Sequence, residues 1–591
     1  MVAVNVRAFG GMVPATEPRL LPDQAAAYAE NTWLYSGALV GIVAPEHVRA
    51  CSGGTSKVYR IPNNYTDAEH LTDAIWLEFA NIDTDVIRSP IADDTFDRYY
   101  WASPVDRPRV NSRARIEAGQ PAFALGVVTP NAAPTLTISG GASTTMSSRA
   151  YVVTWVSAFG EESAPSTPVL GTGKQDASWN LTLPAAGTGD ISTYNLSGAR
   201  IYRTVTSSAG QATYFFVAEL PIATTTYSDT ASDTTVSSNE QLASTAWTPP
   251  PEDLAGWIAM PNGMIAGWRN NELWFCEPYR PHAWPAQYTL TVEYPIIGLG
   301  VINQTLVVCT AGYPMVATGI NPASMTLSKL TSFEPCMSRG SIVSAPEGVY
   351  YASPNGLVLV ANGVASVMTK DLIMKDEWQR LLKASTLRAT RLGSAYFCYG
   401  SARFGVFDEA YQVDAVQQDD FSGSYSGALI DLANQRVAFN VLSSPDPTTN
   451  VFSDPWSGET FLIREDNLYR LNIADEVGPR KPLKWRSKIF QANDLKNFQA
   501  MRIYFDVPPW APELNPIRNT DLVQTLQPDQ YGLVRVYADK NLVMTRELRK
   551  SGELMRLPSG FKADFWQVEI EAVVVIQSFQ MATSVRELLV A

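Results

Sequence analysis

Apolar and polar residues alternate in short runs along most of the chain. Examples are KVYRI at 57–61 and AIWLEFA at 74–80, which lie between residues typical of turns. An alternation with a period of two places one side of a strand in the core and the other side towards solvent. We therefore expect an all-β fold built from many short strands.

Two windows depart from this alternation and predict helices. The first is LPDQAAAYAEN at 21–31, where Pro22 suits a first helical turn and the alanines have high helix propensity. The second is MKDEWQRLLKAS at 374–385. Directly after the first window, TWLYSGALVG at 32–41 predicts two strands joined by a turn at Ser36-Gly37.

Two linkers rich in Pro and small residues divide the chain. One begins near residue 118, and the other contains Pro249, Pro250 and Pro251, which cannot join a strand ladder. Between the linkers, six or seven short strands indicate an immunoglobulin-like or fibronectin type III-like sandwich. We predict four parts: an N-terminal helix and first propeller strands (1–117), an inserted sandwich (118–248), propeller blades (249–479) and a C-terminal β-rich unit (480–591).

Repeated hairpins dominate residues 255–475. Turns are expected at Asn270-Asn271, Asn355-Gly356 and Asn362-Gly363, and a further hairpin turn at Asp539-Lys540-Asn541. Asn-Gly between apolar runs favours a type I′ turn, because both central residues need a positive φ. The hairpins recur at intervals of roughly 40–50 residues, the size of one four-stranded propeller blade. We prefer a β-propeller, and a series of sandwiches is the alternative.

The composition fits a folded protein with large surfaces for neighbouring copies. Hydrophobic residues make up 46 % of the chain and charged residues only 17 %, and interface cores are depleted in charge. The net charge of −13 argues against wrapping DNA, which requires Lys and Arg. A wall that repels phosphate would still let DNA pass, although the charge can equally serve solubility.

Motifs for metals, cofactors and membrane insertion are missing from the sequence. The three histidines (His47, His70 and His282) and the five cysteines have no metal-binding or disulfide spacing. We expect free thiols in a reducing cytoplasm, with Cys276 and Cys309 inside apolar strands. Neither a signal peptide nor an apolar stretch of transmembrane length is visible, so we expect no cofactor, no metal and no membrane anchor.

Motifs for catalysis are also missing, with one exception. The string Gly423–Gly427 has Tyr425 where a nucleophile elbow needs Ser, and GLGVIN at 298–303 lacks the third glycine and is interpreted as a turn. Glycosidases need only two carboxylates at a suitable separation, which leaves the pairs Asp93/Asp94, Glu161/Glu162 and Asp419/Asp420. Each pair lies in an expected loop, so we favour solvated turns over catalysis and expect no enzyme.

The aromatic segment WFCEPYRPHAWP at 274–285 has two interpretations. Trp274, Tyr279, His282 and Trp284 would suit a sugar-binding platform. The alternative is a connection between blades, in which prolines make the segment rigid and the aromatic side chains fill the core. We favour the second interpretation.

Several blocks resemble the tail nozzle (tail tubular protein B-like) family of short-tailed bacteriophages. LPDQAAAYAENTWLYSGALVG (21–41) is similar to the start of these proteins, and RAYVVTWVSAFGEESAPSTP (149–168) to their inserted sandwich. The segment 260–285, YPIIGLGV (294–301) and VYYASPNGLVLV (349–360) resemble the blades that follow. The resemblance covers roughly residues 15–380, and its blocks are specific only in combination.

The resemblance implies a structural virion protein of the phage tail, assembled in the host cytoplasm. It implies a homo-oligomer, a hexameric ring, that binds the head-to-tail adaptor and offers a docking surface for tail fibres or spikes. Phage DNA would pass through the lumen during ejection without sequence-specific binding. The family motifs are architectural, so no functional residue is carried over. A tail-associated polysaccharide hydrolase and a glycan-binding adhesin on a propeller remain the alternatives.

Overall fold

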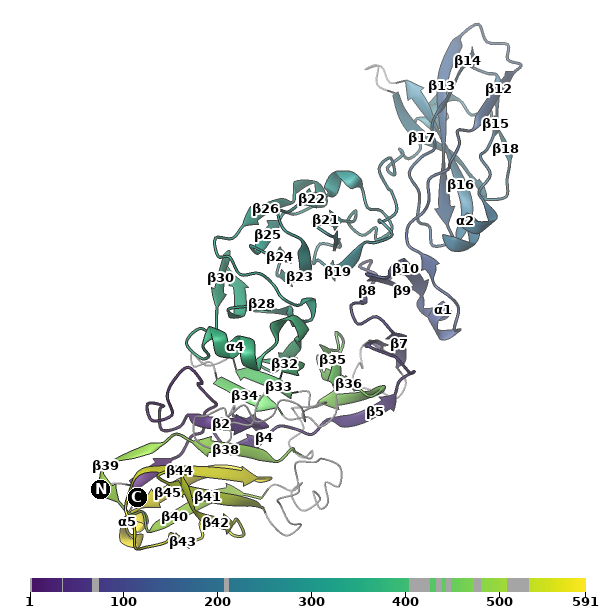
Figure 1. Cartoon of the computed structure of the whole chain (residues 1–591). Helices are drawn as coiled ribbons and strands as arrows, with labels where there is room; N and C mark the ends of the chain where they lie inside the picture. Colours follow the sequence, from purple (N-terminus) through teal and green to yellow (C-terminus); the bar gives the residue numbers. More distant parts are fainter. Residues whose placement is uncertain are drawn as a thin grey trace. The chain divides into compact units, whose positions relative to one another are not determined.

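The computed structural model describes residues 3–34, 36–65, 74–206, 212–402, 426–431, 438–442, 448–471, 480–507 and 531–590 (Figure 1). About half of the described residues lie in strands and few lie in helices, which confirms the all-β prediction. The chain forms two compact units: Met1–Ile82 with Thr331–Ala591 (unit 1), and Asp83–Leu330 (unit 2). This division differs from the four predicted parts, whose boundaries stay predictions.

Unit 2 contains three four-stranded antiparallel sheets, each the size of a propeller blade. The first consists of β8 (Asp85–Arg88), β9 (Arg98–Ser103), β10 (Asp106–Ser112) and β11 (Phe123–Ala124), with the short helix α1 (Arg113–Glu117) between β10 and β11. The second contains β19 (Ala255–Ala259), β20 (Ile265–Arg269), β21 (Glu272–Phe275) and β22 (Leu290–Thr291). The third contains β23 (Ile296–Ile302), β24 (Thr305–Thr310), β25 (Met315–Thr318) and β26 (Thr326–Lys329).

The sandwich is inserted between β11 and β19. One sheet contains β12 (Thr135–Ser139), β15 (Ser178–Thr182) and β18 (Thr226–Asp229). The other contains β14 (Val169–Lys174), β13 (Met146–Ser157), β16 (Leu196–Thr206) and β17 (Ala212–Pro221). The helices α2 (Thr188–Thr193) and α3 (Asp233–Val236) lie in connections. Alternating side chains of both sheets, including Trp155 and Trp179, fill the core between them.

The strand β14 lacks a regular alternation of apolar and polar side chains because glycines interrupt it. A Cβ atom on Gly171 would lie 2.5 Å from Cδ2 of Leu136, and one on Gly173 would lie 2.8 Å from Cγ2 of Ile138. The opposite sheet packs so closely here that only glycine fits the inward positions.

Unit 1 contains further blade-like sheets. One is formed by β27 (Val343–Ala345), β28 (Gly348–Ser353), β29 (Gly356–Ala361) and β30 (Val364–Val367). Another contains β35 (Thr448–Ser453), β36 (Thr460–Arg464) and β37 (Asn467–Leu471), and the N-terminal strand β5 (Glu46–Ala50) is its fourth member. The hairpin of β6 (Lys57–Ile61) and β7 (Ile75–Phe79) follows β5. These sheets confirm a propeller-like, β-rich fold class.

A ten-stranded sheet joins a blade of unit 1 to the C-terminal strands. Its blade part is β31 (Arg388–Leu392), β32 (Ala395–Ala402), β33 (Ser426–Asp431) and β34 (Ala438–Leu442). The order continues through β2 (Ala26–Glu30), β38 (Leu483–Ser487), β44 (Ala563–Ala572), β41 (Gly532–Ala538) and β42 (Asn541–Glu547), with β39 (Phe490–Lys496) paired to β44. Since β2 hydrogen-bonds both β34 and β38, the N-terminal segment connects the two parts.

A second C-terminal sheet also uses the N-terminus. Here β1 (Ala3–Val6) pairs with β45 (Val575–Ala582), which in turn pairs with β40 (Ala500–Asp506), next to β43 (Met555–Arg556). The last helix, α5 (Val585–Val590), follows β45. The two ends of the chain therefore lie side by side, as Figure 1 shows.

Two predicted elements are wrong. The helix predicted at 21–31 is absent, because residues 26–30 form β2, where Ala26 and Ala29 are buried in the large core of unit 1. Hydrogen bonds to a strand on either side outweigh the helix propensity of alanine. The turn predicted at GLGVIN is also wrong, since most of it lies in β23. The positive φ of 52° is at Asn303, at the end of that string.

Other local predictions are confirmed. The predicted helix at 374–385 is α4 (Lys375–Leu381). Asn362 and Gly363 have φ values of 51° and 75°, as a type I′ turn requires, and Asp539 and Lys540 have 44° and 70°. At Asn355-Gly356 the hairpin is present, but only the glycine has a positive φ, of 145°.

Candidate functional site

The aromatic segment 274–285 is packed into the core of unit 2. Trp284 is fully buried and stacks on Trp257, with 5.4 Å between ring centroids. Its indole N–H donates to the carbonyl of Pro281 at 2.8 Å. A sugar-binding platform needs an open aromatic face, and the faces of this pair cover each other.

His282 and Arg280 in the same segment are also held by neighbours. His282 is buried and lies edge-on to Trp247 at 5.6 Å, and the Arg280 guanidinium lies over Trp247 at 4.4 Å. Burial, reinforced by the positive charges of Arg280 and Arg98, lowers the pKa of His282 to about 3. The imidazole is therefore neutral at physiological pH and serves packing. Tyr279 is exposed.

Two of the three predicted carboxylate pairs separate in the structure. Asp419/Asp420 and Tyr425 lie outside the described residues. Asp93 has a φ of 55° in an exposed turn. Glu162 accepts a hydrogen bond of 2.6 Å from the Thr154 hydroxyl and pairs with Arg200 at 3.2 Å. The adjacent carboxylates therefore do not face one another.

Asp94 and Glu161, which belong to two different predicted pairs, both contact Arg98. The Arg98 guanidinium donates through Nε to Asp94 at 2.8 Å and through Nη1 to Glu161 at 2.9 Å. Asp94 lies in the β8–β9 connection, Arg98 begins β9, and Glu161 follows β13 of the sandwich. We call these three residues the joint cluster, because they link the sandwich to the β8–β11 sheet.

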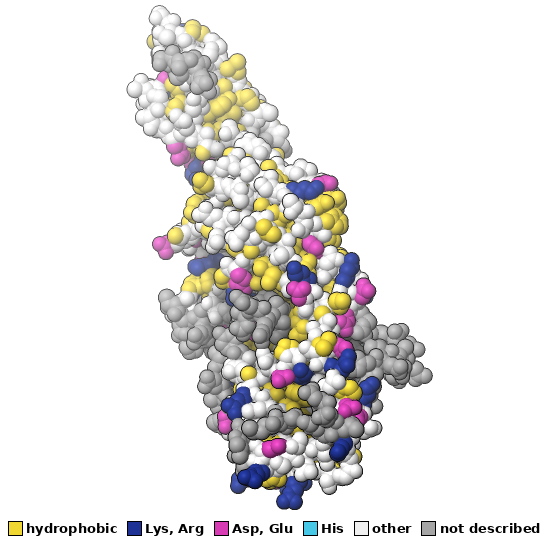
Figure 2. Space-filling model, turned by 90° about the vertical axis from the view of Figure 1, so that its left-hand side faces the viewer, with side chains coloured by type: hydrophobic (Ala, Val, Ile, Leu, Met, Phe, Trp, Pro, Cys, Tyr) yellow, Lys and Arg dark blue, Asp and Glu magenta, His cyan; other side chains and the backbone are white. Residues whose placement is uncertain are grey.

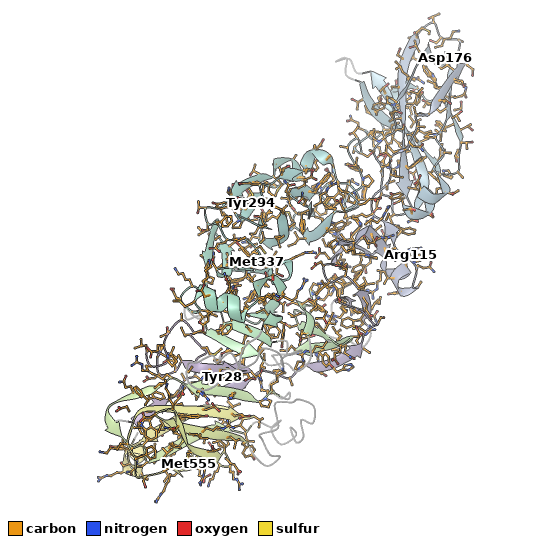
Figure 3. All side chains as sticks on the ribbon, in the orientation of Figure 1. Tyr28, Arg115, Asp176, Tyr294, Met337 and Met555 are labelled. Atoms are coloured by element: carbon orange, nitrogen blue, oxygen red, sulfur yellow. The ribbon has the colours of Figure 1, made fainter. Side chains whose placement is uncertain are left out.

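Aromatic side chains surround the joint cluster. Phe159 contacts Phe96 at 5.1 Å and Phe123 at 6.0 Å between centroids, which brings a sandwich residue against the β8–β11 sheet. The Arg98 guanidinium lies 5.8 Å from the Phe159 ring. The guanidinium of Arg115, which Figure 3 labels, lies 4.3 Å from the centre of the Phe123 ring. The charged groups thus lie in a largely apolar surrounding.

The two carboxyl groups of the joint cluster differ in acidity. Burial raises the pKa of Glu161 to about 7, against the attraction of Arg98. The pKa of Asp94 is lowered, because its hydrogen bonds and attraction to Arg98 outweigh the cost of burial. Separated pKa values are also typical of glycosidase carboxylates. Here the side chains of Glu161 and Asp94 are only 4 % and 7 % exposed, so a glycosidic bond has no access to them.

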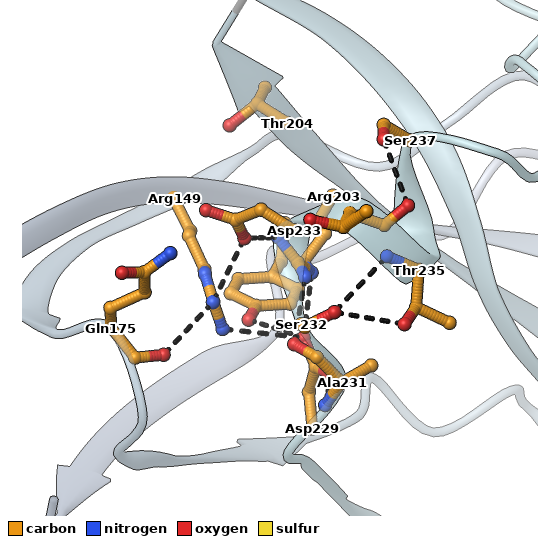
Figure 4. Close-up of polar contacts among 12 residues, drawn as sticks. Arg149, Gln175, Arg203, Thr204, Asp229, Ala231, Ser232, Asp233, Thr235 and Ser237 are labelled. Atoms are coloured by element: carbon orange, nitrogen blue, oxygen red, sulfur yellow. Dashed lines mark hydrogen bonds and ion pairs between the residues drawn. The ribbon is translucent and has the colours of Figure 1, made fainter.

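A second ionic cluster lies inside the sandwich (Figure 4). Arg203 contacts Asp229 at 2.9 Å and Asp233 at 2.6 Å, and Arg149 contacts Asp233 at 2.9 Å. The Tyr151 hydroxyl donates to Asp229 at 2.8 Å. Two arginines face two carboxylates, so the charges balance. We interpret this cluster as structural support, which fixes the β18–α3 connection to β13 and β16.

Unit 1 has its own buried ion pairs. Arg60 of β6 contacts Asp454 at 2.5 Å, and both side chains are 1 % exposed. On β44, Glu569 accepts hydrogen bonds from Arg486 and Arg535, each at 2.7 Å. These pairs connect strands that are far apart in the sequence and again have a structural role.

Metal-binding and membrane-spanning features are not found in the described part of the chain. No group of three or more His, Cys, Asp or Glu side chains gathers there. His47 contacts Asn467 at 3.1 Å, and His70 lies outside the described residues. Cys276, Cys309, Cys336 and Cys398 are buried free thiols, and Cys51 is half-buried. None of the described helices is long and apolar enough to cross a membrane.

Comparisons with known proteins give no functional assignment. No family model and no curated protein matches the chain. Among solved structures, a chain from S. cerevisiae Dbp5 bound to Nup159 and Gle1 matches with 10 % identity and a TM-score of 0.22, over 38 % of this chain and 62 % of that one. Apo AztD from Citrobacter koseri matches with 9 % identity and a TM-score of 0.23, over 59 % and 73 % of the two chains. The N-terminal domain of Nup159 has 8 % identity and a TM-score of 0.20, over 46 % and 85 %. Similarities of this size carry no argument about function.

Proposed function

We propose that this chain is a structural virion protein, the subunit of a ring-shaped tail nozzle in a short-tailed bacteriophage. In this role a homo-hexamer binds the head-to-tail adaptor, offers a docking surface for tail fibres or spikes, and conducts DNA during ejection. The proposal starts from the sequence blocks that resemble the tail nozzle family.

The order of domains in unit 2 is the observation that carries the proposal. A blade-like sheet (β8–β11) is followed by the sandwich and then by two further blade-like sheets, β19–β22 and β23–β26. The resemblance implies the same order, with a sandwich inserted among blades. The blocks 149–168 and 260–285, which carry the resemblance, lie in the sandwich and in the blade that follows it.

Surface composition is compatible with contacts between copies. In unit 1, large apolar side chains are exposed at Phe333, Val364 and Met374, with exposed fractions of 52 %, 61 % and 60 %. Figure 2 shows hydrophobic side chains gathered on the face that it draws. Contiguous apolar patches are typical of surfaces that other proteins cover, whereas single exposed apolar side chains are ordinary. The net charge of −13 suits a lumen that does not bind phosphate.

The test is the assembly state of the purified full-length protein and of the virion. We expect sixfold rings in electron micrographs, and a mass of six chains in light scattering at the protein concentrations reached in infected cells. A chain that stays monomeric both in solution and in virions would contradict the proposal. Genes for a portal and an adaptor beside this one would support it.

The two alternatives have less support. An adhesin that uses the segment 274–285 would need Trp284 at the surface, whereas the structure buries it. A hydrolase that uses Asp94 would need substrate access to a side chain that is 7 % exposed. Release of reducing sugar from host capsule by the purified protein would favour the hydrolase over the nozzle.

A further inference from the structure

We propose that the joint cluster of Asp94, Arg98 and Glu161 is a proton-controlled latch that docks the sandwich onto the β8–β11 sheet. The inference concerns how the two parts of unit 2 are held together. It does not depend on the proposed function, since a monomer would have the same latch.

The first step is the position of the cluster. Arg98 and Asp94 belong to the β8–β11 sheet, whereas Glu161 belongs to the sandwich, 63 residues away from Arg98 in the sequence. The Glu161–Arg98 contact of 2.9 Å is therefore an ionic bond between the two parts. If the sandwich undocks, both groups return to water.

The second step is the balance of charge. Two carboxylates share one guanidinium, and the structure gives Glu161 no second cationic partner among the described side chains. With both carboxyls ionised, the cluster carries one uncompensated negative charge in a buried place, which is unfavourable. With Glu161 protonated, Asp94 and Arg98 balance, and the carboxylic acid still accepts a hydrogen bond.

The third step is the surroundings of Glu161. From the β8–β11 sheet, Asp94, Arg98 and the Tyr100 hydroxyl interact with it electrostatically. From the sandwich, the Ser157 hydroxyl lies 3.5 Å from its carboxylate. Its neighbour Glu162 is directed to Thr154 and Arg200.

The segment 276–285 contributes the remaining charges near the latch. Arg280 and Arg98 both act electrostatically on His282, whose neutral state adds no positive charge. The groups that mainly shift the pKa of Glu161 are Arg98, Asp94 and Ser157, and none of them lies on this segment.

The sign of the pH dependence follows from the acidity of Glu161. Its pKa is about 7 when docked, because of burial, against 4.5 as its ordinary value. The docked form thus holds a proton between these two pH values that the undocked form releases. The docking equilibrium constant should fall up to about tenfold per pH unit as the pH rises from 4.5 to 7, and stay constant above 7.

The test is hydrogen–deuterium exchange of the full-length protein from pH 5 to 9, corrected for the intrinsic rate at each pH. The reporter is the loop 157–163, whose Glu161 and Ser163 amides are hydrogen-bonded. We expect its protection factor to fall about tenfold per unit up to pH 7 and then level off. Protection of the sandwich core strands β13 and β16 should not follow this profile.

Three variants complete the test. Glu161→Gln fixes the neutral state, so its loop protection should not change with pH. Glu219→Gln, the matched control, changes an exposed glutamate of the same sandwich and should keep the wild-type profile. Asp94→Asn removes the negative charge that helps to raise the pKa of Glu161. The pH at which the protection factor levels off should therefore be lower than in the wild type.

Each result decides the proposal. A wild-type protection factor that is constant from pH 5 to 9 would overturn it, and so would a Glu161→Gln profile equal to that of the wild type. If Glu161→Gln does not fold, Asp94→Asn decides alone. If the protection factor of that variant still levels off at pH 7 or at a higher pH, the latch is also overturned.

Discussion

Glu161 in unit 2 and Glu569 in unit 1 are both buried glutamates that contact arginine, yet their acidities move in opposite directions. Their side chains are 4 % and 2 % exposed. Glu161 shares Arg98 with Asp94, and burial raises its pKa to about 7. Burial alone would also raise the pKa of Glu569.

Glu569 differs because it is surrounded by cations. Burial raises its pKa, but the attraction of Arg486 and Lys484 and the hydrogen bonds from Arg486 and Arg535 outweigh burial and lower it. The cations around Glu569 outweigh the effect of burial, whereas the one arginine that Glu161 shares with Asp94 does not. Ion pairs of similar geometry can therefore respond to pH with opposite sign.

The largest expected effect is the loss of the single arginine of the joint cluster. Arg98→Met leaves Asp94 and Glu161 buried without a cation, which we expect to cost about 3–5 kcal/mol at pH 8. The measurement is the opening free energy of β9 from hydrogen exchange at increasing urea concentration. The matched variant Arg486→Met leaves Arg535 on Glu569, so its loss should be smaller, about 1–2 kcal/mol. Equal losses would contradict the comparison.

The next effect is seen in the wild-type protein on acidification. As the pH falls from 8 to 5, protonation of Glu161 should stabilise the joint by up to about 3 kcal/mol, because its docked pKa lies above the ordinary value. Over the same range, Glu569 remains ionised and should contribute no change, since its pKa is lowered below 4.5.

Below pH 4.5 the two regions should diverge further. The stabilisation from ionised Glu569 is lost as the pH falls through its lowered pKa, whereas Glu161 is already protonated. The measurement is the protection of β44 and of the loop 157–163 in a hydrogen-exchange experiment that is extended below pH 4.5. Parallel pH profiles of the two segments would show that general acid effects, and not these two groups, control the exchange.

Much of the fold could be predicted from local pattern, because strands and turns follow from nearby residues. The hairpin at Asn362-Gly363 needs two positive φ values, and the sequence supplies residues that adopt them. The exceptions are strands made of small residues. Ala26 and Ala29 in β2, and Gly171 and Gly173 in β14, lie where neighbouring strands approach closely, and that proximity is set by distant parts of the chain.

The joint cluster could be predicted only in part. Asp94 and Glu161 stood out as members of adjacent carboxylate pairs, but their neighbours Asp93 and Glu162 have no part in the cluster. Arg98 carries no signal of its own, since it is the first residue of an ordinary aromatic strand, RYYW. Its contact with Glu161 exists only after the sandwich docks on the sheet, so local spacing could not indicate it.

Replacing each glutamate by glutamine should destabilise the region around Glu569 but not the region around Glu161, although both side chains are buried. Glu569→Gln removes a charge that two arginines stabilise, and we expect a loss of about 1–2 kcal/mol at pH 7. Glu161→Gln at pH 8 removes an unbalanced charge, so the joint should keep its stability or gain. Local opening free energies of β44 and β9 measure the two effects. A larger loss in Glu161→Gln would mean that its ionised carboxylate holds the joint.

The smallest effect separates burial from pairing. The Arg200 Nε atom lies 2.7 Å from the Glu219 carboxylate, the same distance as between Arg486 Nε and Glu569, but the Glu219 side chain is 48 % exposed. Water screens such a pair, so Glu219→Gln should cost less than about 1 kcal/mol. The change should shrink further at high salt, as measured by the opening free energy of β17 in low and high salt. A salt-independent loss as large as that of Glu569→Gln would show that pairing distance, rather than burial, determines what these ion pairs contribute.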